Sequence, residues 1–155
     1  MLGIGDKLPE FEVVGVKPKF MEHEQNGESA FEPLTQDSFP GKWKIIVFYP
    51  KDFTFVCPTE LHAFQEALPE FEKRDTIVIG ASCDTPEVHF AWLSTSKDNG
   101  GIEGVTYDLL ADSNRNLANI LGILDTTNVR IDEETGVEVR DGDNVTYRAT
   151  YLIDE

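Results

Sequence analysis

The sequence predicts an α/β fold in which a mixed sheet, partly parallel and partly antiparallel, is covered by helices. Two continuous apolar runs, at residues 44–49 and 76–82, have the composition of strands that are buried on both faces. A helical pattern follows each run, and a hairpin and an alternating strand come after them. The strand–helix–strand–helix order predicts parallel strands, and the later hairpin predicts the antiparallel part.

The composition is that of a single globular domain covering residues 1–155. The chain is 40% hydrophobic, which is enough apolar material for a core. Its formal net charge is -16, and it has no basic run longer than two residues. Because nucleic acids and anionic membranes both require clustered Lys and Arg, neither is expected as a partner. The chain also has no apolar run near the ~20 residues that cross a bilayer.

The N-terminus and the cysteine content indicate a cytoplasmic protein. Residues 1–6 contain no basic segment followed by an apolar one, so we expect no signal peptide. The two cysteines, Cys57 and Cys83, are too few for the disulfide framework of a secreted protein. A reducing cytoplasm is therefore the expected environment.

The first half of the chain begins with a short strand at residues 11–16. Residues 17–40 are rich in Pro, Gly, Asn and acids, which predicts a loop with one further strand near 30–34. The apolar run at 44–49 is the first central strand. A helix follows Cys57, because apolar residues recur there at steps of three and four, namely Leu61, Phe64, Leu68 and Phe71.

The second central strand, at 76–82, leads into another helix. This helix is expected from Pro86 to about Lys97, with proline in its first turn and Asp84 or Thr85 as its cap. The two strands and two helices together supply the parallel part of the predicted sheet.

Shorter elements follow. A strand at 108–111 precedes a helix at 113–121, which Ser113 is expected to cap and the next glycine to end. Residues 129–132 and 137–140 flank a turn and predict a hairpin. The alternation of side chains over 145–153 predicts the final strand.

One thiol lies where protein geometry favours a thiolate. Cys57 begins a helix just after a buried strand, and Thr54 precedes it by three residues. A cysteine thiol ordinarily has a pKa near ~8.5, and lowering that value to ~6 requires about 3.4 kcal/mol of preference for the anion. A helix N-terminus gives only ~0.3–1 kcal/mol. A guanidinium at ~4 Å gives ~4 kcal/mol at an effective dielectric constant near 20, so the site needs a fixed cation.

The run from Phe48 to Glu60 reads Phe-Tyr-Pro-Lys-Asp-Phe-Thr-Phe-Val-Cys-Pro-Thr-Glu. It resembles the active-site motif of the peroxiredoxins, the thiol peroxidases. The likeness is to their typical two-cysteine branch, which includes the bacterial alkyl hydroperoxide reductase peroxidase subunit. Residues 86–92, 109–115 and 148–154 also match family signatures. The resemblance runs from Gly3 onward, and it implies a thioredoxin-like fold of the peroxiredoxin type. No cofactor is expected, because His, Cys and acidic residues show no spacing typical of a metal cluster.

The resemblance also implies a role for each site residue. Cys57 would attack a hydroperoxide and become a sulfenic acid, and Arg148 would be the cation beside its thiolate. The Thr54 hydroxyl and the Cys57 backbone N–H would hold the peroxide. Pro50 would screen the sulfenate from water, and Glu60 would orient arginine side chains. Each residue also has a simpler interpretation. Thr54 could be a helix cap and Pro50 the end of a strand. Glu60 could be an ordinary acid in the first turn of a helix, and Arg148 a solvated arginine.

The other reactive side chains have less specific interpretations. Cys83 is expected to be a buried packing thiol, with a resolving role as the alternative because neighbouring strands lie only ~4.8 Å apart. Lys51 is expected to face solvent. The three histidines show no pairing with a cysteine and are expected at surface or packing positions, namely His23, His62 and His89. Since His, Cys and acids show no ligand spacing, no metal site is expected.

The chain departs from the family pattern in two places. It ends at Glu155 directly after a strand, whereas typical two-cysteine members continue to a C-terminal helix and a resolving cysteine. A truncated or partly ordered form is the favoured interpretation, with resolution by an external thiol as the alternative. The loop at 99–104 partly resembles the family's glycine-glycine-leucine-glycine loop, which is associated with slow resolution and easy over-oxidation. A simple glycine-rich turn explains it equally well.

The predicted function is a thiol peroxidase that acts on hydrogen peroxide and organic hydroperoxides. Its expected partners are a thiol reductant protein, thioredoxin-like or dedicated, and further copies of itself in a homodimer or a ring of dimers. Trp92 and the loop at 53–55 would suit the contact surface, although Trp92 could equally be core. One alternative is a thiol–disulfide oxidoreductase, but that class needs Cys-x-x-Cys and position 60 is Glu60. The other is a non-enzymatic chaperone module, which would not need the thiol, hydroxyl and guanidinium together.

Overall fold

A six-stranded mixed sheet lies at the centre of the computed structural model, which describes residues 2–155 apart from the side chains of residues 20, 21 and 23. The strand order is β2-β1-β5-β4-β3-β8. β3, β4 and β5 are parallel to one another, and β1, β2 and β8 join the sheet in antiparallel pairings. The predicted mixed sheet is therefore confirmed. Its strands are β1 (Glu12–Val16), β2 (Phe31–Thr35), β3 (Trp43–Phe48), β4 (Thr76–Ser82), β5 (Leu109–Ala111) and β8 (Ala149–Ile153).

The central strand β3 is buried on both faces, as its unbroken apolar run predicts. Ile45 and Val47 belong to one core cluster, and Ile46 and Phe48 belong to the other. This division follows from the pleat, which directs successive side chains to opposite faces of a sheet. The sheet thus needs a helical cover on each side.

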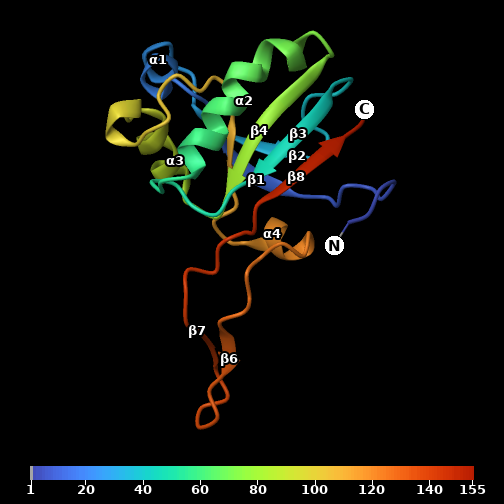
Figure 1. Cartoon of the computed structure of the whole chain (residues 1–155), viewed down its shortest axis with the longest axis vertical. Coiled ribbons are helices and arrows are strands. Elements are labelled where there is room, and N and C mark those ends of the chain that lie inside the picture. Colours follow the sequence, from blue (N-terminus) through green and yellow to red (C-terminus); the bar gives the residue numbers. More distant parts are fainter. Residues whose placement is uncertain (1) are drawn as a thin grey trace.

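Two helices, α2 (Cys57–Glu72) and α3 (Pro86–Leu93), cover one face of the sheet (Figure 1). Leu61 of α2 and Trp92 of α3 are fully buried against it. The short helix α4 (Asn116–Ile120) packs on the other face, and α1 (Phe20–Gln25) lies between β1 and β2 in the chain. None of the helices described in residues 2–155 is long and apolar enough to span a membrane.

The helix α3 is shorter than the sequence indicates, since it ends at Leu93 rather than near Lys97. The Thr95 hydroxyl donates to the Ala91 carbonyl at 2.7 Å, which is a local bond that competes with continued helix. Residues 97–99 then form a separate 3-10 turn, η1 (Lys97–Asn99). At the other end Thr85, not Asp84, caps the helix and accepts from the Val88 N–H at 3.4 Å.

The predicted cap of α4 is wrong. The helix begins at Asn116, and Ser113 instead donates its hydroxyl to the Asp84 carbonyl. The free N–H groups of Leu117 and Ala118 donate to the Asp112 carboxylate at 3.1 and 2.7 Å. The short helix α1 was also not predicted, because six residues are too few to show a helical period.

The hairpin of β6 (Val129–Ile131) and β7 (Glu138–Arg140) forms a separate two-stranded sheet that projects from the body (Figure 1). Its base is held by the bridge between Leu124 and Thr146 and by the Tyr147 N–H, which donates to the Ile123 carbonyl at 2.8 Å. These pairings occupy residues expected in the final strand. As a result, β8 begins at Ala149 and not near residue 145.

Candidate functional site

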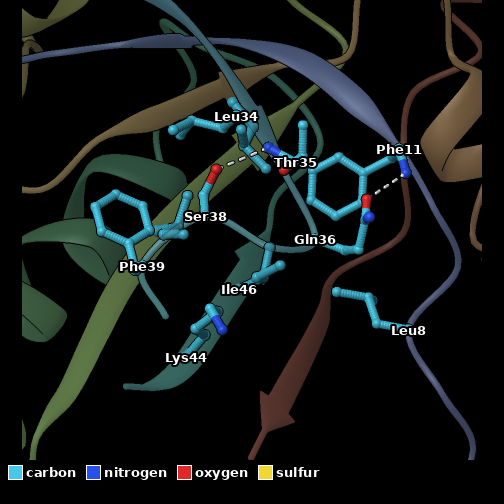
Figure 2. Close-up of a pocket in the computed structure, with 11 residues that line it drawn as sticks. Leu8, Phe11, Leu34, Thr35, Gln36, Ser38, Phe39, Lys44 and Ile46 are labelled. Carbon is cyan, nitrogen blue, oxygen red and sulfur yellow. Dashed lines mark hydrogen bonds between the residues drawn. The ribbon is translucent and has the colours of Figure 1, made fainter. Parts of the chain in front are cut away.

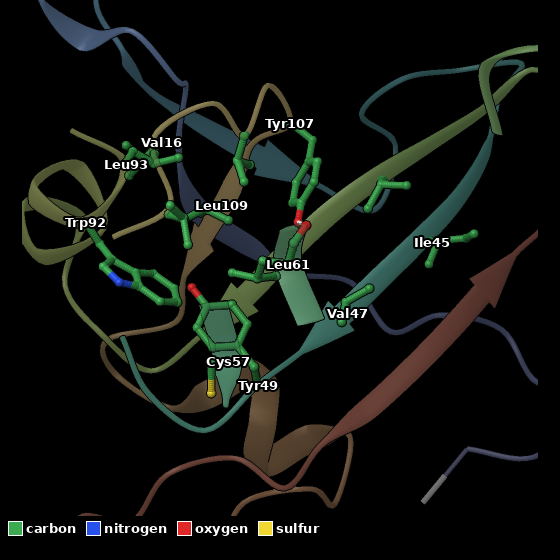
Figure 3. Packing of buried hydrophobic residues seen from close by; sticks show 13 residues of the cluster. Val16, Ile45, Val47, Tyr49, Cys57, Leu61, Trp92, Leu93, Tyr107 and Leu109 are labelled. Carbon is green, nitrogen blue, oxygen red and sulfur yellow. Dashed lines mark hydrogen bonds between the residues drawn. The ribbon is translucent and has the colours of Figure 1, made fainter. Parts of the chain in front are cut away.

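Cys57 is the first residue of α2 and is almost completely buried, with 1% of its surface exposed. The residue before it, Val56, occupies the cap position without a side-chain hydrogen bond to the helix. The first turn therefore keeps free N–H groups close to the sulfur, which favours an anion there. Figure 3 shows the thiol beside the Tyr49 ring, at the edge of the apolar cluster that contains Leu61.

Arg148 lies in the segment that leads into β8, and it brings its guanidinium to the thiol. Its Nη2 donates to Cys57 Sγ at 3.7 Å. Its Nε donates to both carboxylate oxygens of Glu60, at 3.0 and 3.1 Å. The guanidinium thus places a positive charge beside the sulfur, and 47% exposure of the Arg148 side chain lets water screen part of its electrostatic effect. The structure thus brings together the side chains of Cys57, Arg148 and Glu60, whose catalytic roles stay predictions.

Thr54 and Pro50 flank the loop between β3 and α2. The Thr54 hydroxyl donates to the Lys51 carbonyl at 3.1 Å, so it neither bonds to the sulfur nor caps α2. The helix-cap interpretation of Thr54 is therefore wrong. Pro50 is half-buried two residues after the end of β3, which agrees with its reading as a strand end.

Lys51 forms an ion pair with Asp143. Its Nζ lies 2.8 Å from Asp143 Oδ2, and the exposed pair ties the loop to the base of the hairpin. The hydrogen bond with Asp143, together with that carboxylate's charge, raises the pKa of Lys51. The lysine is half-exposed, as expected, and is engaged by an acid of its own.

Cys83 packs on the face of the sheet opposite Cys57. It lies among the apolar side chains that contact α4, such as Leu117, whereas Cys57 belongs to the cluster beneath α2. Both cysteines are free thiols. Burial raises the pKa of Cys83 to about 12, which keeps it protonated and unreactive at neutral pH. These observations fit the packing interpretation and separate Cys83 from the resolving role.

A buried polar network lies beneath the loop, and sequence reasoning missed it. Asp52 contacts His89 and Tyr49, with His89 Nδ1 and Asp52 Oδ2 only 2.7 Å apart. His89 is at a packing position as expected, but it is hydrogen-bonded on both sides of its ring. His62 is half-buried, and the side chain of His23 lies outside the described residues. The aspartate and histidine are 37 positions apart, so no local pattern could have paired them.

Two hollows flank the sheet. One of about 170 Å³ is bordered by Glu60, Phe64 and Arg148, two of which are predicted site residues. The other, of about 10 Å³, lies on the opposite face between Leu34 and Ile46 and the N-terminal segment (Figure 2). That space holds at most one water molecule.

Over residues 2–155 no group of three or more His, Cys, Asp or Glu side chains is placed to hold a metal ion.

Comparison with known proteins gives a consistent result. The model of the AhpC/TSA family matches residues 4–155. Peroxiredoxin 1 of Brugia malayi is 38% identical over 99% of this chain and 56% of its own length. Alkyl hydroperoxide reductase C of Mycobacterium tuberculosis is 36% identical over 83% of this chain and 66% of its own length. The chain therefore spans between about half and two thirds of these relatives.

Solved structures of the same kind superpose on most of the chain. Mycobacterium tuberculosis AhpC matches with a TM-score of 0.74 and 31% identity, over 99% of this chain and 77% of that one. The reduced 2-Cys peroxiredoxin of Plasmodium vivax matches with a TM-score of 0.75 and 30% identity, over 97% of this chain and 66% of that one.

Proposed function

The chain belongs to the AhpC/TSA family, and on that premise we propose that it is a thiol peroxidase reducing hydrogen peroxide and organic hydroperoxides. Its mixed sheet with covering helices is the thioredoxin-like fold of the peroxiredoxin structures, as expected from the sequence. Residues 1–155 act in this proposal as one domain, without a cofactor.

The observation that carries the proposal is the contact of Arg148 Nη2 with Cys57 Sγ at 3.7 Å. The thiolate attacks one oxygen of ROOH, so that an S–O bond forms as the O–O bond breaks. The leaving RO⁻ takes a proton and departs as ROH, and Cys57 becomes a sulfenic acid. Arg148 stabilises the thiolate beforehand and the charge that moves onto the oxygens during attack.

The remaining site residues serve binding. Rotation about the Thr54 side chain takes its hydroxyl from the Lys51 carbonyl, where it now donates, toward a peroxide oxygen. The Cys57 backbone N–H provides a second donor at the helix start. Glu60 holds the guanidinium plane through two bonds to Nε, and Pro50 limits water beside the sulfur. Together these groups keep the peroxide in line with the attacking sulfur.

We further propose that a thiol reductant protein reduces the sulfenic acid and restores the Cys57 thiol. The proposed enzyme is cytoplasmic and forms a homo-oligomer. Two free thiols suit a reducing compartment. One relative, Plasmodium yoelii Prx1a modified at its N-terminus, forms an octamer described as artifactual. A thiol–disulfide oxidoreductase is not favoured, because Cys83 packs on the other face of the sheet.

Replacement of the two cysteines tests the proposal. Cys57→Ser should abolish consumption of hydrogen peroxide measured with dithiothreitol as reductant, because serine is a far weaker nucleophile at this position. Cys83→Ser is the matched control and should retain most of the activity, since the buried thiol only packs. Peroxide consumption that persists in Cys57→Ser would refute the peroxidase assignment.

A further inference from the structure

A pair of buried ionisable side chains lies directly beneath the loop that carries Thr54. Asp52 comes from that loop and His89 from α3, and both side chains are completely buried. His89 Nδ1 and Asp52 Oδ2 are 2.7 Å apart. The proposed reaction assigns neither residue a role, yet burying two ionisable groups is costly unless they are paired.

The hydrogen-bond partners of His89 determine where its protons lie. Its Nε2 is 2.9 Å from the carbonyl oxygen of Leu110, and a carbonyl can only accept, so Nε2 carries a hydrogen. Its Nδ1 faces a carboxylate oxygen, and a separation of 2.7 Å requires a proton between the two. That proton can sit on either partner: burial raises the pKa of Asp52 and favours the carboxylic acid, whereas the hydrogen bonds from His89 and Tyr49 favour the carboxylate. Because Tyr49 already donates to the other oxygen of Asp52, we assign the proton to Nδ1, which makes the histidine an imidazolium held against a carboxylate.

The groups around the pair reinforce this state. The Tyr49 hydroxyl donates to the second oxygen of Asp52 at 2.7 Å, and burial raises the pKa of Tyr49 well above its usual range, so it remains a neutral donor. The backbone N–H of Asp52 donates to Asp84, whose carboxylate also accepts from the Ser82 hydroxyl. Burial alone would lower the pKa of His89, but the hydrogen bond and charge of Asp52, helped by the Asp84 charge, raise it overall.

Asp52 lies two residues before Thr54, so the Asp52–His89 pair can affect the position of the Thr54 hydroxyl. The next residue, Phe53, has a φ of 56°, which is a strained conformation for a bulky residue and persists only where neighbours enforce it. The Phe53 ring lies on Trp92 of α3, with ring centroids 6.1 Å apart. Thr54 follows at once. The loop is thus attached to α3 at two consecutive residues immediately before the hydroxyl proposed to bind peroxide.

We propose that Asp52 and His89 are positioning residues, and that their shared proton fixes the loop presenting Thr54 to Cys57 until alkaline pH removes it. A histidine whose pKa is raised by folding stabilises the folded loop fully below its unfolded value of ~6.5, and that stabilisation is lost as pH rises through the folded value. The consequences for catalysis rest on the proposed function, whereas those for loop structure do not.

The first experiment uses the unmodified site. Nitrogen NMR of the His89 ring should show both nitrogens protonated at pH 7, with loss of one proton only at higher pH. In a Trp43→Phe background, the fluorescence of Trp92 reports the contact with Phe53 and should change over the same pH interval. A neutral His89 at pH 7, or a loop transition unrelated to its titration, would overturn the proposal.

The second experiment measures peroxide reduction against pH. The rate constant should fall on the alkaline side, because loss of the shared proton releases the loop that presents Thr54. His89→Gln should lower kcat/KM roughly 10- to 100-fold at neutral pH, the range expected for a misplaced binding group, and should remove the alkaline fall. His62→Gln is the matched control, because that histidine is on α2 and lies 3.4 Å from the Gly101 carbonyl, away from the loop. It should keep both the rate and the alkaline fall.

A chemically conservative double variant separates positioning from general damage. Asp52→Asn should reproduce the loss seen in His89→Gln, and the two changes combined should cost little more than either alone, because both remove one interaction. Fully additive losses, or an alkaline fall that survives in His89→Gln, would contradict the proposal. If even the unmodified chain consumes no peroxide, the peroxidase assignment fails while the NMR and fluorescence results still decide the positioning claim.

Discussion

The guanidinium of Arg148 donates hydrogen bonds to two partners, the thiol of Cys57 and the carboxylate of Glu60. Because Glu60 engages Nε through both of its oxygens, the far end of the planar guanidinium is directed at Sγ. The carboxylate is itself an anion near a thiolate, so its direct effect opposes ionisation while its positioning effect supports it. The guanidinium contacts the sulfur directly, at 3.7 Å, and carries the opposite charge, so its effect should dominate.

Arg148→Ala should therefore slow peroxide reduction at least tenfold, because it removes a positive charge that contacts the sulfur and stabilises the charge moving onto the oxygens during attack. The attraction of ~4 kcal/mol expected at this distance is an upper bound that water around the half-exposed arginine reduces. Stopped-flow measurement of hydrogen peroxide consumption gives the rate constant. Arg130→Ala, an exposed hairpin substitution, is the control and should leave the rate constant as it was. An unaltered rate constant in Arg148→Ala would mean that another group provides the cation.

At this scale the sequence predicted the residues better than their contacts. Cys57 was predicted from its place at a helix start, and Arg148 from a family signature together with the need for a cation, and both lie as expected. The donation of Thr54 to a backbone carbonyl depends on the conformation of one loop, which no sequence pattern encodes. The pairing of Asp52 with His89 depends on the docking of α3 against the sheet, and is likewise a tertiary property.

Among the elements, those with long periodic patterns were predicted well. β4 has the expected bounds, and α2 shows the expected apolar face, because many residues contribute to each signal. The start of α4 was misplaced because Asp112, outside the helix, supplies the bonds that a local cap would have made. The bounds of long elements follow from residue propensity and from the hydrophobic pattern, whereas the bounds of short elements depend on single tertiary contacts.

The turn after η1 contains two neighbouring glycines that are required for different reasons. Gly100 has a φ of 78° with open space around it, so a side chain there meets only backbone strain. At Gly101 an added Cβ would lie 1.9 Å from the carbonyl oxygen of Thr95, which the backbone cannot avoid without moving. This turn also directs Ile102 into the core and receives the Trp92 indole N–H on the Gly100 carbonyl.

Gly100→Ala should lower the free energy of unfolding by about 1–2 kcal/mol, the usual cost of a left-handed residue with a Cβ. Gly101→Ala should cost clearly more, because the added Cβ would overlap backbone atoms of Thr95 that cannot move aside freely. Urea unfolding followed by circular dichroism gives both values. Equal losses in the two variants would show that the turn moves freely, and would count against the tight packing described here.

On the scale of the whole molecule, the loop that precedes Cys57 exposes three large apolar side chains close together in the sequence. Phe55 is fully exposed, and Phe53 and Val56 are each exposed by more than half. Trp92, by contrast, is completely buried, so its suggested place in a contact surface is wrong and its core interpretation is right. Exposed aromatic side chains next to a reactive site favour contact with another protein surface.

We expect this surface to associate with a second copy of the chain, more strongly at high salt. The net charge of -16 opposes association, and added salt screens it while leaving apolar contact intact. Sedimentation velocity of the reduced protein at low and high ionic strength measures the effect, and oxidation of Cys57 should weaken the assembly by loosening the loop. Phe55→Ser should shift the protein toward monomer, whereas Ile131→Ser, at an exposed apolar position on the hairpin, should not. A reduced protein that remains monomeric at every salt concentration would contradict the assembly claim.

The hairpin of β6 and β7 divides the reactive centre between two parts of the polypeptide. Cys57 and Glu60 precede it, and Arg148 follows it on a segment held by the five-residue ladder between β8 and β3 and by the Thr146 hydroxyl, which donates to the Tyr49 carbonyl. The hairpin pairs only with itself over its strands. Proteolytic cleavage at its tip, in residues 133–136, would therefore place Cys57 and Arg148 on two separate fragments. The two side chains would still lie next to each other in the folded protein. We therefore expect that two fragments, one ending and one beginning at the hairpin tip, can associate to form the site, and that separating the two fragments abolishes it.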